Sequence, residues 1–72
     1  MKLYFENSRK ERRLIAEPET EEAAMEAIHA FCEERNFKIY YVRTWMIPDG
    51  LKKFDVGSHF EFFYLSYDKD NN

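Results

Sequence analysis

The chain has 72 residues and a formal net charge of −3 at pH 7. This length suits one domain, near the lower limit at which a chain can fold alone, and the negative charge argues against general affinity for nucleic acids. No apolar run is long enough for a signal peptide or a membrane span, and one cysteine forms no internal disulfide. We therefore predict a single cytoplasmic domain over residues 1–72 that does not engage a membrane.

The N-terminal part of the chain is predicted to form a β-hairpin. Lys2 to Glu6 alternates apolar and polar residues and is rich in residues that favour strands. Asn7 and Ser8 are turn residues, and Arg12 to Glu17 is the expected return strand. Pro18 then breaks the strand before the next element.

The segment from Thr20 to Asn36 predicts a long amphipathic helix. Thr20 can accept a hydrogen bond from a free amide of the first turn, and Asn36 is a suitable end. At about 100° per residue, one apolar stripe forms. It consists of Ala24, Met25, Ile28, Phe31 and Cys32.

After the helix, Phe37 to Ile47 is the segment with the strongest strand composition, and Pro48-Asp49-Gly50 predicts a turn. The remainder allows three interpretations. A short strand at Lys53 to Val56 can precede a last strand at His59 to Tyr67, residues 48–58 can form one loop, or a single strand can bulge at Gly57. We favour the first, and we expect a frayed polar tail at residues 68–72.

The order β-β-α-β-β, with one further short strand as an option, predicts an α+β fold. It would consist of an antiparallel sheet with one helix packed on one face, in two layers.

The predicted strands are apolar on both sides. In the last strand, Phe60, Phe62 and Tyr64 point one way, whereas Phe63, Leu65 and Tyr67 point the other way. One helix covers only one face of a sheet, so the second face predicts an interface with a second copy or with another protein. The alternative is that its tyrosines tolerate water and the loop covers the rest. The predicted contact residues on this second face are Tyr40, Trp45, Phe63 and Tyr67.

The residues that carry catalytic or metal chemistry are few. His29, Cys32 and His59 are the only soft metal ligands, and they fall short of the four that a structural zinc site needs. No motif marks a nucleophile or an oxyanion loop, and Ser58-His59 beside Asp55 is typical of a turn. We predict no metal, no cofactor and no enzymatic activity.

A basic cluster at the first hairpin supports an alternative function. Arg9, Lys10, Arg12 and Arg13 could meet phosphates while aromatic side chains of the sheet stack on the bases of a single strand. The excess of acidic residues and the lack of a nucleotide-binding motif favour a solvated hairpin tip.

The hairpin with Leu14-Ile15, the Ala- and Glu-rich helix and the segments YYVRTW and FDVGSHFEFFYL resemble small proteins encoded by phages and prophages of Firmicutes. These proteins have no assigned activity, so the resemblance implies a setting and no site residue. It implies a compact product in the host cytoplasm that binds a host or phage protein. The sequence therefore predicts a non-enzymatic binding module that engages a protein partner or itself.

Overall fold

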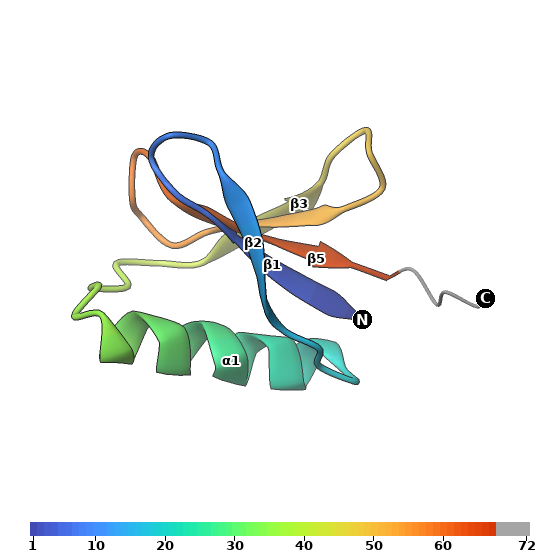
Figure 1. Ribbon diagram of the computed structural model, residues 1–72, viewed down its shortest axis with the longest axis horizontal. Helices are drawn as coiled ribbons and strands as arrows, with labels where there is room; N and C mark the ends of the chain where they lie inside the picture. The colour runs from blue at the N-terminus through green and yellow to red at the C-terminus, as the bar shows by residue number, and fades with distance from the viewer. Residues whose placement is uncertain (68–72) are drawn as a thin grey trace.

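The computed structural model describes residues 1–67 and shows a five-stranded antiparallel sheet with one helix against one face (Figure 1). The elements are β1 (Lys2–Glu6), β2 (Arg12–Ala16), α1 (Glu21–Glu34), β3 (Arg43–Met46), β4 (Lys52–Asp55) and β5 (Phe62–Ser66). The strand order across the sheet is β2-β1-β5-β4-β3. The predicted two-layer α+β fold is confirmed, and the optional short strand exists as β4. The predicted frayed tail lies outside the described residues.

Both ends of α1 form as the sequence predicts. The hydroxyl of Thr20 accepts a hydrogen bond of 3.0 Å from the backbone N–H of Ala23. At the other end Asn36 takes the left-handed conformation, with φ of 58°. The N–H of Phe37 then donates to the carbonyl of Cys32 at 2.8 Å. This pattern satisfies carbonyls that the last turn would otherwise leave free.

The core lies between α1 and the middle of the sheet. In the sheet register Leu3 lies opposite Leu65, and Phe63 lies opposite both Phe5 and Phe54. Residues directly opposite each other share a face, so these side chains form one apolar surface toward the helix. The buried cluster consists of Leu3, Phe5, Ala24, Ile28, Cys32, Phe54, Val56, Phe63 and Leu65.

The predicted assignment of the two faces of the last strand was wrong. Phe63, expected on the uncovered face, is fully buried in the core. Tyr67 also turns toward the helix, where its hydroxyl donates to the carboxylate of Glu21. The two residue sets do alternate as predicted, but the set that contains Phe62 and Tyr64 faces away from the helix. A strand has a side-chain period of two, so the wrong choice exchanges every side chain at once.

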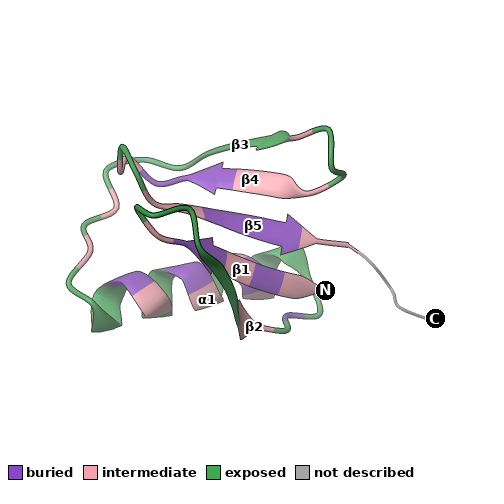
Figure 2. Ribbon diagram, turned by 45° about the horizontal axis from the view of Figure 1, so that its top comes forward, coloured by how far each residue is buried: buried purple, intermediate pink, exposed green. Residues whose placement is uncertain are grey.

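The predicted long strand from Phe37 to Ile47 was also wrong in extent. Only Arg43–Met46 forms β3, because its partner β4 is four residues long and offers no further positions for pairing. Tyr40 lies outside the sheet, and its N–H donates to the carbonyl of Val56 at 3.1 Å. The segment most typical of a central strand therefore supplies an edge strand, far from the helix (Figure 2).

Candidate interaction surfaces

The sheet face opposite the helix, here called the open face, is covered at its centre by side chains of the sheet itself. Tyr64 donates a hydrogen bond of 2.9 Å to Glu6. Arg12 binds the other oxygen of Glu6 at 3.3 Å and holds its guanidinium carbon 3.8 Å from the centre of the Tyr64 ring. Tyr64 is consequently only 3% exposed. Burial, together with the bond to Glu6, raises the pKa of the Tyr64 hydroxyl, which therefore remains a neutral donor.

Lys53 covers the neighbouring aromatic residues on the open face. Its ammonium nitrogen lies 4.0 Å from the ring centre of Phe62, 5.6 Å from that of Tyr64 and 5.7 Å from that of Trp45. Long cationic side chains can cover apolar surface with their aliphatic stems while the charged end interacts with aromatic rings. The centre of the open face therefore needs no second layer.

The exposed apolar side chains gather instead at the far edge of the sheet. Among the described residues seven large hydrophobic side chains are exposed, and five of them fall between residues 40 and 46. They are Tyr40 (67%), Tyr41 (47%), Val42 (40%), Trp45 (42%) and Met46 (56%). We call residues 40–46 the β3 edge; its strand appears as exposed along its length in Figure 2. Of the predicted contact residues, Tyr40 and Trp45 lie here, whereas Phe63 and Tyr67 do not.

An ion pair links β3 to its neighbour β4. Arg43 donates a hydrogen bond of 3.0 Å to Asp55, whose other oxygen accepts from the N–H of Gly57 at 2.9 Å. Burial opposes ionisation of Asp55, but the bonds from Gly57 and Arg43 outweigh it and hold the pKa of this carboxyl below its usual value. Arg43 also lies 5.2 Å from the ring centre of Tyr41. The only cation of the β3 edge is thus engaged within the chain.

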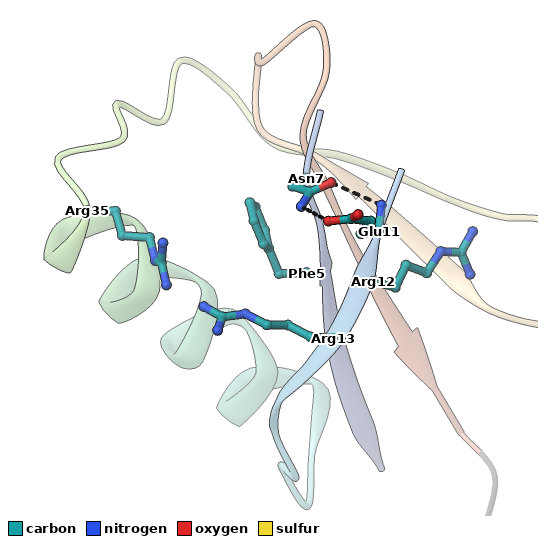
Figure 3. A pocket seen from close by; sticks show the side chains of 6 residues that line it. All are labelled: Phe5, Asn7, Glu11, Arg12, Arg13 and Arg35. Atoms are coloured by element: carbon teal, nitrogen blue, oxygen red, sulfur yellow. Dashed lines mark hydrogen bonds between the residues drawn. The ribbon is translucent and has the colours of Figure 1, made fainter. Parts of the chain in front are cut away.

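The basic residues of the first hairpin do not form one surface. Figure 3 shows the side chains of Arg12 and Arg13 on opposite sides of β2. Arg12 is bound to Glu6 on the open face, whereas Arg13 reaches toward the helix, 6.0 Å from the ring centre of Phe31. Arg9 lies at the exposed tip of the hairpin, next to Lys10 in a left-handed turn conformation. Of the four predicted phosphate contacts, Lys10 and Arg12 border one hollow on the open face, whereas Arg13 lies on the side of the helix.

A basic hollow of about 490 Å³ lies between the hairpin and the end of α1 (Figure 3). Arg13 borders it from β2 and Arg35 from the helix, with the Arg35 guanidinium carbon 4.4 Å from the ring centre of Phe31. Asn7 and Glu11, joined by a hydrogen bond of 3.0 Å, form its other wall. Its charge favours an acidic group, although both arginines are also explained by packing over Phe31.

The residues with catalytic or metal-binding side chains are dispersed or bonded locally. Within residues 1–67 no three His, Cys, Asp or Glu side chains lie close enough to hold a metal ion. Cys32 is buried, which raises the pKa of its thiol and lowers its reactivity. Ser58 donates to Glu61 at 2.6 Å and accepts from the Glu61 N–H at 3.2 Å, as expected for a turn. No helix of the described chain is long and apolar enough to cross a membrane.

Comparisons with protein-family models, with curated proteins and with solved structures find no match for this chain. Its function must therefore be inferred from the surfaces described above.

Proposed function

We propose that this chain is a non-enzymatic protein-binding module whose binding surface is the β3 edge. The observation that carries the proposal is the concentration of exposed apolar side chains on the outermost strand of the sheet. A strand in this position can pair with a strand of another protein, which adds backbone hydrogen bonds to the burial of apolar side chains.

The two edges of the sheet differ in a way that supports this proposal. Natural proteins commonly protect an edge strand with charged side chains that discourage pairing. The outer strand β2 carries Arg12 and Arg13 beside each other, and Glu11 precedes them. The outer strand β3 carries a single charge, Arg43. The β3 edge is therefore the less protected of the two.

The resemblance to phage-encoded proteins gives this proposal a setting. That resemblance implies a partner in the host cytoplasm, either a host or a phage protein, and this partner stays a prediction. The fold and the β3 edge support the binding mode and leave the partner open.

Capture of partners by variants of the β3 edge tests the proposal. The immobilised chain would be compared with a double variant, Trp45→Ser with Met46→Lys, and with the control Leu14→Ser. Leu14 is 45% exposed and lies on the opposite edge, so the control removes a similar apolar side chain elsewhere. We expect proteins captured by the wild type and the control to be lost with the double variant. Equal capture by all three forms would contradict the proposal.

A second candidate function is binding of single-stranded nucleic acid, favoured by one observation. A hollow of about 350 Å³ on the open face is bordered by two of the predicted phosphate contacts, Lys10 and Arg12, and by Lys53, His59 and Phe60, of which Phe60 is 67% exposed. Such a site should bind oligonucleotides with an affinity that falls steeply as salt rises. Fluorescence anisotropy with oligo-dT, comparing the wild type with Lys10→Glu and Phe60→Ala, would detect it. We expect no binding, because Arg12 and Lys53 already cover the aromatic rings that bases would need.

A further inference from the structure

The backbone groups of β3 that remain free follow from its pairing with β4. Ile47 donates its N–H to the carbonyl of Leu51 at 2.9 Å, and Trp45 lies opposite Lys53 in the same register. In an antiparallel pair, residues whose backbone groups face the partner alternate with residues whose groups face away. Trp45 and Arg43 therefore face β4, whereas the N–H and C=O groups of Thr44 and Met46 point outward from the sheet.

We propose that the strand taken up by the β3 edge is the β3 edge of a second copy, antiparallel to the first, with a two-fold axis through Thr44. This inference rests on the proposed function and names its partner. In this register the two Thr44 residues exchange both backbone hydrogen bonds across the axis. The two sheets join into one continuous sheet with β3 and its symmetry mate at the centre.

The side chains of the β3 edge are complementary to themselves in this register. The numbers of two opposite residues add to twice that of Thr44, the residue on the axis. Arg43 therefore lies opposite Trp45 of the second copy. Both lie on the open face, because their partners Asp55 and Lys53 do. A guanidinium group and an indole ring form a favourable pair.

The other face of the joined strands gains an apolar pair. Val42 meets Met46 of the second copy, and the same contact occurs twice because of the symmetry. These side chains are 40% and 56% exposed in the single chain, since the helix does not extend under β3. The self-pairing would therefore cover side chains from both faces of the β3 edge.

Two neighbouring positions for the axis fit less well. An axis through Met46 would place Thr44 opposite Pro48, which has no N–H to donate, and would involve the turn that follows β3. An axis through Val42 would require the N–H of Tyr40, which already donates to Val56. The axis through Thr44 uses the whole strand and neither of these residues.

A charge-complementation experiment tests both the dimer and its register. Sedimentation of the wild-type chain across the micromolar range should show a mass that rises with concentration, because an edge pairing of this length buries little area. Val42→Glu and Met46→Lys should each weaken the dimer at least tenfold. Mixing the two variants should restore it, because Glu at position 42 in one copy faces Lys at position 46 in the other. Native mass spectrometry would identify this heterodimer.

Controls separate the inference from folding and from the broader function. Both substituted side chains are exposed, so circular dichroism should show unchanged folds, and Leu14→Glu on the other edge should leave the dimer intact. A monomer at all concentrations, a dimer indifferent to both charges, or a mixture without heterodimer would overturn the inference. If the dimer were overturned in this way, loss of captured proteins with the double variant of the β3 edge would still support binding of a different protein. Failure of the dimer and failure of the proposed function are therefore distinguishable.

A disulfide experiment gives an independent measure of the axis. Opposite residues of a hydrogen-bonded antiparallel pair have Cα atoms about 5.5 Å apart, a separation that a disulfide can bridge. Thr44→Cys should therefore form a covalent dimer under mild oxidation, whereas Leu14→Cys should not. The native Cys32 is 1% exposed and does not compete. Equal cross-linking at both positions would indicate random collision and contradict the proposed axis.

Discussion

Arg12 lies with its guanidinium carbon 3.8 Å from the ring centre of Tyr64 and binds the same carboxylate, Glu6, to which Tyr64 donates. The three side chains come from three adjacent strands, β2, β1 and β5. Together they bury a tyrosine on a sheet face that has no helix over it. This arrangement explains how a domain with one helix tolerates a sheet with aromatic residues on both faces.

Replacement of Arg12 by Ala tests this role. We expect a loss of about 1–2 kcal/mol in the free energy of unfolding, because the cation–π contact and the ion pair are both removed. Urea denaturation followed by circular dichroism would measure it. The control is Arg9→Ala, at the exposed tip of the same hairpin, which should change the stability little. Equal effects of the two substitutions would show that Arg12 contributes only charge.

The alternation of side chains within each strand could be predicted from the sequence. Which of the two sheet faces packs against the helix was harder to predict. Both residue sets of the last strand are rich in aromatic residues, so the period of two is clear while its phase is ambiguous. One signal was present. Leu3 and Phe5 form the apolar side of the first strand, and they lie opposite Leu65 and Phe63 of the last strand. Tyr4, on the other side of the first strand, lies opposite Tyr64. Comparing strands in pairs would have identified the face toward the helix.

The position of the exposed apolar segment was beyond what the composition could show. Residues 37–47 have the β-branched and aromatic content of a central strand, and the length of β4 limits how much of this segment pairs. That limit comes from the turn at Gly57, which ends the pairing. The helix was predictable because Thr20 and Asn36 act within a single turn of backbone, with no dependence on distant residues.

The corrected faces predict opposite outcomes for two aromatic residues. Phe63→Ala should cost about 3–5 kcal/mol, because it opens a cavity in the core beneath the helix. Trp45→Ala should cost no more than about 1 kcal/mol in the single chain, because its ring is 42% exposed at the β3 edge. Thermal unfolding of both variants at low concentration would compare them. A larger loss for Trp45 than for Phe63 would reverse the assignment of the faces.

Gly57 provides a prediction about the turn that ends β4. Its φ is +100°, and a Cβ atom added there would lie 2.8 Å from the Cβ of Tyr40. Gly57→Ala should therefore cost about 2–3 kcal/mol, from backbone strain and from displacement of Tyr40. Gly50→Ala is a matched control, since Gly50 has φ of +85° but no atom within 4 Å of an added Cβ. Chemical denaturation should show the smaller loss for Gly50. Equal losses would mean that the contact with Tyr40 contributes nothing.

Asp55 predicts how the stability of the chain depends on acid. The residue is 6% exposed, and its carboxylate accepts bonds from the Gly57 N–H and from Arg43, at 2.9 Å and 3.0 Å. Burial opposes ionisation, yet these bonds keep the pKa below its usual value. A carboxyl whose pKa is lower in the folded chain stabilises it above the unfolded pKa of about 3.9, and this contribution is lost as the pH falls through the folded pKa.

Asp55→Asn should therefore reduce the free energy of unfolding by about 1–3 kcal/mol at neutral pH, because a charged hydrogen-bond acceptor is lost. The same substitution should also flatten the fall in stability as the pH drops from neutral to below about 4. Urea denaturation across this range would measure both effects, with Asp49→Asn in the exposed turn as the control. An unchanged acid dependence in Asp55→Asn would mean that the bonds from Gly57 and Arg43 do not favour the ionised carboxyl in the folded chain. The anchor between β3 and β4 would then have to come from backbone pairing alone, and the β3 edge would keep its position without Arg43.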